Sequence, residues 1–161
     1  MRLFLPIAFA MLTLAGTACS QATPAPAAAV ATPAKHPISG LDVVSLTVSQ
    51  NGKSHAFRVE VARTFGQQQK GLMFRTAMGP DEGMLFPSDT AEPRSFWMKN
   101  TLIPLDIVFI GPDHLISNIA ANAVPYSEAP IPSEGPAIAV LELNGGRAAQ
   151  LGIMPGARVS W

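Results

Sequence analysis

The stretch from Ser95 to Ile110 sets the tightest limits on how this chain can fold. It is the densest apolar and aromatic run outside the N-terminus, and Pro104 divides it in two. Proline cannot donate to a sheet ladder and disfavours helix at the residue before it, so we expect a turn over 100–104. Residues 105–110 are apolar on both faces except at Asp106, which predicts a central strand covered on both sides.

Shorter apolar segments recur along the rest of the chain. Residues 44–48 and 57–61 alternate apolar and polar side chains, the pattern of half-buried strands. Asn51-Gly52 lies between them and is the preferred pair for a two-residue hairpin turn. Further strands are expected over 83–86, 95–99, 115–121, 137–143 and 158–161, with loops over 87–94 and 122–136.

Two short helices complete the expected pattern. Thr64 and Gln67 have the spacing of a capping box, which predicts a helix from residue 65 to about 73. Residues 147–151 form a helical turn that Gly152 ends. Tight turns join most of the strands, which favours antiparallel pairing. The sequence therefore predicts a β-rich α+β domain, with an antiparallel or mixed sheet curled toward a small barrel and one or two short helices.

The N-terminal part of the chain has the features of an export signal. Residues 1–18 combine Arg2, an apolar run and small residues, as in a secretory signal peptide. Residues 14–19, Leu-Ala-Gly-Thr-Ala-Cys, resemble a bacterial lipoprotein processing site, which implies lipidation of Cys19. Ser20 then implies anchoring in the outer membrane, facing the periplasm. An ordinary cleaved signal is the alternative.

A tether is expected between this signal and the folded domain. Residues 19–40 are rich in Ala, Pro and Thr and offer little apolar surface to bury, so they are predicted to be a disordered spacer. Residues 41–161 are then expected to form a single domain.

The charge balance argues against one large class of partner. The chain has 11 basic and 11 acidic residues, and removal of residues 1–18 takes away Arg2 and leaves 10 against 11, a net charge of −1. Binding to nucleic acid needs a clustered basic excess, so we expect no nucleic-acid partner. Contact with a membrane is expected through the lipid anchor only. Cys19 is the single cysteine, so no disulfide can form within the chain.

Five short motifs occur in a characteristic order, and together they cover the expected domain. The motifs are Gly71-Leu72-Met73-Phe74-Arg75, Gly83-Met84-Leu85-Phe86, Phe96-Trp97-Met98-Lys99-Asn100-Thr101, Pro104-Leu105-Asp106 and Val140-Leu141-Glu142-Leu143. In this order they resemble the family called domain of unknown function 192, an uncharacterised ancient prokaryotic region, over about residues 43–161. The resemblance implies a small β-rich domain, often exported, with no established activity.

Charges set within apolar strands mark the candidate site. Lys99, Asp106 and Glu142 are such charges, and a lone buried charge is costly, so each should find a partner or reach a cleft. Arg75 and Arg94 are available partners. One interpretation is a polar network that closes the end of the barrel, and the other is a cleft for a small polar ligand. The candidate ligand-binding residues are Trp97, Lys99, Asn100, Thr101, Asp106, Glu142 and Arg75.

Binding of a small polar ligand, or of a partner component of the cell envelope, is favoured over catalysis as the activity of this site. Strand alternation puts Trp97 and Lys99 on one face, a platform on which a sugar ring can stack. Asp106 and Glu142 could serve as acid and base in glycoside hydrolysis. The chain has no Gly-x-Ser-x-Gly elbow, His-Glu-x-x-His helix or phosphate loop. A hydrolase acting on envelope glycans and a purely structural module remain the alternatives.

A metal site is the remaining class. Met73, Met78, Met84, Met98 and Met154 carry thioethers, which suit Cu(I). Methionine more often fills gaps in a core, so no metal or cofactor is predicted.

Overall fold

The predicted hairpin is the first large element of the sheet. In the computed structural model, which describes residues 34–161, strand β2 (Asp42–Gln50) pairs antiparallel with β3 (Lys53–Val61). Asn51 and Gly52 have φ values of 51° and 76°, the left-handed conformation that the predicted turn requires. This hairpin confirms the prediction from the alternating sequence.

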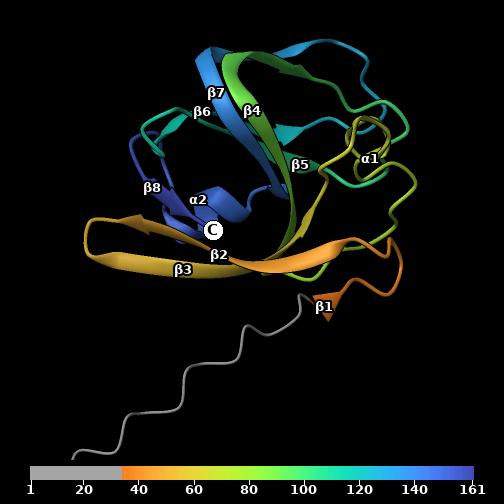
Figure 1. Ribbon diagram of the computed structural model, residues 1–161, viewed down its shortest axis with the longest axis horizontal. Helices are drawn as coiled ribbons and strands as arrows, with labels where there is room; N and C mark the ends of the chain where they lie inside the picture. The colour runs from red at the N-terminus through yellow and green to blue at the C-terminus, as the bar shows by residue number, and fades with distance from the viewer. Residues whose placement is uncertain (1–33) are drawn as a thin grey trace, which may run out of the picture. The chain divides into compact units, whose positions relative to one another are not determined.

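The strands form one curled sheet (Figure 1). Its order is β1-β2-β3-β4-β7-β5-β6, and β8 also pairs with β2. Within residues 34–161, β3 and β4 are the single parallel pair, because helix α1 (Phe65–Lys70) crosses between them. The other bounds are β1 (Ala34–Lys35), β4 (Glu82–Phe96), β5 (Leu105–Ile110), β6 (Ile116–Ala123), β7 (Ile131–Asn144), helix α2 (Arg147–Leu151) and β8 (Arg158–Ser160).

The C-terminal segment draws the two ends of the sheet together. β8 pairs with β2, with Val159 opposite Val48. The backbone N–H of Val159 also donates to the His114 carbonyl at 2.9 Å, and that of Ile116 donates to the Ala157 carbonyl at 2.9 Å. The sheet is therefore mixed and curled toward a barrel without being closed, which confirms the predicted fold class.

The inner parts of β4 (83–86) and β7 (139–143) and the whole of β5 are buried on both faces. All six residues of β5 are buried, as predicted for a central strand. One core lies toward β2, β3, β8 and α2, and the second core contains Leu72 and Met98 from the segments on either side of β4. Successive residues alternate between the two cores, with Leu85, Val108 and Leu141 in the first and Met84, Ile107 and Val140 in the second.

The loop predicted over 87–94 is strand instead, and so is part of the loop predicted over 122–136. β4 continues through 87–96 and β7 begins at Ile131, so their outer halves pair, with Pro93 opposite Pro136 and Phe96 opposite Ile131. Register shifts interrupt this ribbon twice. Polar residues led to the loop prediction over 87–94 and prolines to the one over 122–136, but a two-stranded extension tolerates proline where no ladder N–H is needed. The strand predicted over 95–99 ends at Phe96.

The folded domain begins before the boundary predicted at residue 41. β1 pairs Ala34 with Val43, and the Ser39 hydroxyl donates to the Glu60 carboxylate on β3. Residues 34–40, which the prediction assigned to the tether, therefore contact the folded domain. The predicted signal peptide, Cys19 and the rest of the tether lie outside the described residues. No helix within residues 34–161 is long and apolar enough to cross a membrane.

The Asp106 side chain on β5 holds β6 and α2 in place by hydrogen bonds to their backbone. Its side chain is fully buried, and its Oδ1 accepts hydrogen bonds from the backbone N–H groups of Asn122 and Gly146, each at 2.9 Å. Its Oδ2 accepts from the N–H of Ala148 in α2 at 2.8 Å. Because Gly146 provides no side-chain cap for α2, the Asp106 carboxylate takes that role.

We predict that Asp106→Ala lowers the free energy of unfolding by about 3 kcal/mol, because three backbone N–H groups lose their acceptor and a typical intramolecular hydrogen bond contributes about 1 kcal/mol. Urea denaturation of the variant measures this loss. Asp89→Ala, at an exposed position on β4, is the matched control and should change stability by less than about 0.5 kcal/mol. Equal losses in the two variants would contradict the capping role.

Candidate functional site

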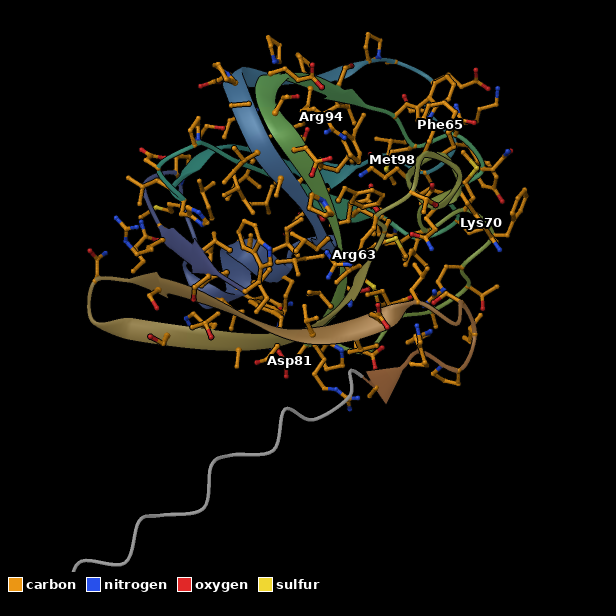
Figure 2. All side chains as sticks on the ribbon, viewed as in Figure 1. Arg63, Phe65, Lys70, Asp81, Arg94 and Met98 are labelled. Carbon is orange, nitrogen blue, oxygen red and sulfur yellow. The ribbon has the colours of Figure 1, made fainter. Side chains whose placement is uncertain are left out.

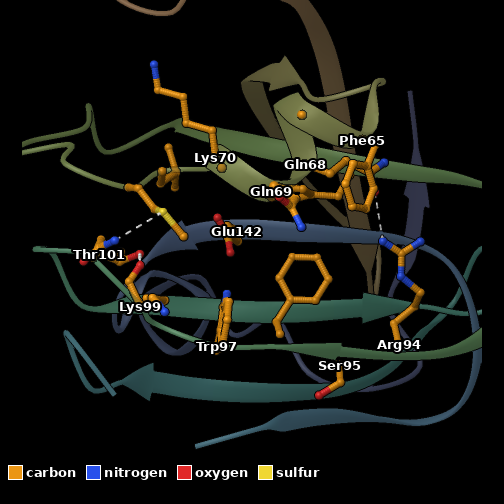
Figure 3. A pocket seen from close by; sticks show the side chains of 17 residues that line it. Phe65, Gln68, Gln69, Lys70, Arg94, Ser95, Trp97, Lys99, Thr101 and Glu142 are labelled. Atoms are coloured by element: carbon orange, nitrogen blue, oxygen red, sulfur yellow. Dashed lines mark hydrogen bonds between the residues drawn. The ribbon is translucent and has the colours of Figure 1, made fainter. Parts of the chain in front are cut away.

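A cleft of about 770 Å³ lies between α1 and the end of β4 with the segment that follows it (Figure 3). Glu142 of β7 lies between these two walls in Figure 3. Five of the seven predicted ligand-binding residues line this cleft, namely Trp97, Lys99, Asn100, Thr101 and Glu142. The opposite wall includes Phe65, Gln68, Gln69 and Lys70 of α1.

The α1 wall is positioned by polar contacts. The predicted capping box is present, with the Thr64 hydroxyl accepting from the Gln67 N–H and the Gln67 amide oxygen accepting from the Thr64 N–H. No residue within α1 is buried. The Gln68 amide holds the helix in place by donating to the carbonyls of Ala62 at 3.1 Å and Pro87 at 2.8 Å. The helix ends at Lys70, earlier than predicted, because Gly71 leaves the helical conformation.

Trp97 forms the exposed face of the other wall. Its side chain is 47% exposed and is therefore not enclosed by the core. The Lys99 ammonium lies 5.0 Å from the centroid of the Trp97 ring, a cation–π contact. The two side chains thus lie together as predicted, although their backbone is a turn and not a strand. Lys99 also lies 3.7 Å from the exposed carboxylate of Glu128.

Met98 anchors this wall to the protein interior. Its side chain is fully buried and points inward (Figure 2), while its N–H donates to the Ser127 carbonyl at 2.8 Å. The Thr101 N–H donates to the Met98 carbonyl and closes the turn. Asn100 adopts a φ of 53° in that turn, and its carbonyl accepts from the Phe74 N–H at 2.8 Å. Asn100 and Thr101 therefore help to fix the shape of the cleft.

Glu142 is the unusual group of the cleft. Its side chain is 5% exposed, and its Oε2 is buried without a hydrogen-bond partner. Its neighbours across the sheet are Met84 on β4 and Ile107 on β5. Burial in these apolar surroundings raises the pKa of Glu142 to about 8, so the carboxyl is neutral at pH 7. A neutral carboxyl can donate a hydrogen bond as well as accept one.

Two predicted site residues lie elsewhere. Arg75 does not line this cleft but forms a buried two-point ion pair with Glu60, with nitrogen–oxygen distances of 2.9 and 3.0 Å. Asp106 is paired with Leu143, while the neighbouring pair joins Ile107 to Glu142, so the two carboxyl groups face opposite sides of the sheet. Asp106 and Glu142 therefore cannot act together on one glycosidic bond, and both Asp106 and Arg75 have structural roles.

The α1 wall was not predicted from the sequence. Gln68, Gln69 and Lys70 have the composition of an ordinary solvent-exposed helix, and nothing local indicates that this helix covers Glu142. Arg94 was considered only as a partner for a buried acid. It lies at the far end of the cleft, where its guanidinium donates to the Gln68 amide oxygen at 3.2 Å. Within residues 34–161, no group of three or more His, Cys, Asp or Glu side chains is placed to hold a metal ion.

We predict that the free energy of unfolding of the Glu142→Gln variant rises progressively relative to that of the wild type as the pH increases from about 4.5 to about 8. The unfolded chain loses this proton near the ordinary value of 4.5, while the folded protein keeps it until about pH 8. The folded state therefore binds more protons in this window, and its stability falls by up to about 1.4 kcal/mol per pH unit. Glutamine cannot ionise and escapes this loss.

Urea denaturation across pH 4–9 measures the difference between the two proteins. Glu134→Gln, at an exposed position on the same strand, is the matched control and should follow the wild type at every pH. If the difference in stability between Glu142→Gln and the wild type did not change with pH, the pKa of Glu142 would not be raised in the folded protein.

Comparison with known proteins places the chain among relatives of the same fold. It is similar to a crystallised protein of unknown function from Novosphingobium aromaticivorans DSM 12444, with 56% identity, a TM-score of 0.79, and coverage of 82% of this chain and 94% of that chain. It is also similar to a protein from Sinorhizobium meliloti 1021 described as a candidate transcription regulator, with 44% identity, a TM-score of 0.70, and coverage of 72% and 91%. No curated protein matches the chain.

The family comparison agrees with the motifs quoted above. The family model for domain of unknown function 192, described as an uncharacterized ancient region, matches residues 46–161. This range includes both walls of the cleft as well as Glu142. The chain therefore belongs to the domain of unknown function 192 family.

Proposed function

We propose that this domain binds a small polar ligand in the cleft between α1 and the Trp97–Thr101 segment, with carbohydrate as the favoured class. The observation that carries the proposal is the Glu142 Oε2, which is buried at the base of the cleft without a partner. An unsatisfied buried polar group costs about 1–3 kcal/mol, and a ligand that supplies the missing hydrogen bond offsets that cost.

Trp97 supports the choice of carbohydrate. Its ring is half exposed on the wall of the cleft, and an aromatic face is a suitable surface for the C–H groups of a sugar ring. The amides of Gln68 and Gln69 and the side chain of Asn100 add polar groups around it. Apolar walls with a few convergent polar groups are typical of small-molecule sites.

We place this binding activity in the cell envelope, on the basis of the N-terminal sequence. The signal-like residues 1–18 and the processing pattern at Cys19 support export and attachment to a membrane by a lipid, with the outer membrane favoured. One acyl chain anchors a protein only marginally, whereas several on one residue anchor it stably. The balanced charge of the chain disfavours the nucleic-acid contact that a transcription regulator makes.

Two alternatives have less support. Hydrolysis of envelope glycans by a pair of carboxyl groups requires both to face the glycosidic bond, and Asp106 faces the opposite side of the sheet from Glu142. A purely structural module accounts for Asp106 and Arg75, since both are fully paired. It gives no reason for an unpartnered carboxyl directed into an open cleft.

We predict that the mature chain binds at least one member of a panel of simple sugars and peptidoglycan fragments, and that Trp97→Ala weakens this binding about tenfold or more. Isothermal titration calorimetry measures both affinities. Loss of the aromatic platform removes the stacking contact, and tenfold corresponds to about 1.4 kcal/mol.

The second tryptophan provides the control for this experiment. Trp161 is 43% exposed, packs against His114 with the rings tilted by 36°, and does not line the cleft. Trp161→Ala should therefore leave the affinity unchanged. The proposed function fails if no panel member binds, or if the two substitutions reduce binding equally.

We also predict that Cys19→Ser moves the protein from the membrane fraction to the soluble periplasmic fraction, because the lipid can no longer be attached. Cell fractionation followed by immunoblotting measures the distribution. A variant that stays in the membrane fraction would refute the lipoprotein assignment, without bearing on the cleft.

A further inference from the structure

The charged groups that line the cleft are strongly unbalanced. Within residues 34–161, its lining contains three cations, which are Lys70 of α1, Arg94 of β4 and Lys99 of the following turn. Glu142 is the one acid among these lining residues, and it is buried. Figure 3 shows Lys99 and Arg94 on either side of Trp97, with Glu142 facing them from the sheet. A cationic ligand would be repelled at this entrance, whereas an anionic one would be attracted.

We infer that the ligand is a carbohydrate that carries a carboxylate, with its ring on Trp97 and its acidic group between the cations and the Glu142 carboxyl. This inference rests on the proposed function and specifies the chemical class of its ligand. The following contacts support it.

Arg94 is held in a suitable orientation. One of its nitrogens donates to the Gln68 amide oxygen at 3.2 Å, and the centre of its guanidinium lies 5.9 Å from the centroid of the Phe96 ring. A guanidinium has five N–H donors in a planar fork, so the bond to Gln68 leaves donors for a carboxylate. Its side chain is half-buried, which limits the entropy lost when a ligand binds.

Lys99 has a partner that a ligand can replace. Its ammonium lies 3.7 Å from the carboxylate of Glu128, and the two side chains are 40% and 61% exposed. An exposed ion pair of this kind contributes at most about 1 kcal/mol. A ligand carboxylate seated over Trp97 can therefore take the place of Glu128 at little cost.

The protonation state of Glu142 makes the binding of an anionic ligand depend on pH. At pH 7 its carboxyl is neutral and can donate a hydrogen bond to an anion, and above about pH 8 it ionises and repels the same anion. Beside it on the sheet, Met84 and Ile107 are apolar. Arg94 and Lys99 are the cations on the opposite wall of the cleft, and the Lys70 ammonium of α1 points away from Glu142 (Figure 3). Affinity for an acidic sugar should therefore fall about tenfold per pH unit above about pH 8.

The test compares pairs of sugars that differ in one carboxylate. Calorimetry with the mature chain measures N-acetylmuramic acid against N-acetylglucosamine, and glucuronic acid against glucose, at pH 6.5 and pH 9. We expect the acidic member to bind at least tenfold more tightly at pH 6.5 and to lose this advantage at pH 9. Glu142→Gln keeps a donor and should bind the acidic sugar with an affinity that no longer changes with pH.

Substitution of the cations gives a second, independent measurement. Lys99→Met and Arg94→Gln should each reduce binding of the acidic sugar about tenfold more than they reduce binding of the neutral sugar. Lys53→Met, at the exposed end of the β2–β3 hairpin, is the matched control and should change neither affinity. Should Glu142→Gln fail to fold, these variants and the pH dependence of the wild type still decide the question.

The outcomes separate the inference from the proposed function. If neutral and acidic sugars bind equally well, or if the cation variants weaken both alike, the inference is overturned and carbohydrate binding stands. If neither kind of sugar binds the folded protein, both are overturned. A preference for the acidic sugar that depends on Lys99, on Arg94 and on pH supports both.

Discussion

Burial of β5 and of the inner parts of β4 and β7 on both faces is the constraint on which the rest of the structure depends. A strand covered on both sides has no solvent for its polar side chains, so each must find partners within the protein. Asp106 meets this requirement with three backbone N–H donors and thereby fixes α2 beneath the sheet. Glu142 belongs to the neighbouring residue pair of β5 and β7, and its Oε2 has no hydrogen-bond partner. The contrast between these two acids separates the scaffold of this domain from its candidate site.

The cleft combines a rigid floor with walls that are held more lightly. Its floor is the centre of the sheet, where Glu142 lies between Met84 and Ile107. The α1 wall buries no residue of its own and depends on the capping box and on Gln68. The opposite wall is a turn anchored by Met98. Elements with few buried contacts open most readily, so a ligand can enter between these walls while the sheet keeps the Glu142 carboxyl in place.

Features that depend on interactions between residues close in the sequence could be predicted, whereas features that depend on distant residues could not. The hairpin at Asn51-Gly52 and the capping box at Thr64 are local, and both were predicted correctly. The outer halves of β4 and β7 stabilise each other through long-range pairing, which overrides the turn signals of their prolines. Asp106 and Glu142 were recognised as unusual, but the face that each occupies depends on strand register. A shift of one residue in pairing would reverse it, and nothing local specifies that pairing.

A carboxyl at position 142 does something that an amide there could not. Glutamine would supply the same donor at the base of the cleft without any cost that depends on pH. Glutamate instead holds its proton only because the surroundings are apolar, and burial raises its pKa to about 8. The carboxyl is therefore neutral at pH 7, and it ionises when the pH rises above about 8 or when a cation approaches. With Lys99 and Arg94 at the entrance, the charge of an incoming ligand and the proton on Glu142 become thermodynamically linked, and each must influence the other equally. An amide would give shape selectivity alone, whereas this acid also makes the cleft sensitive to charge.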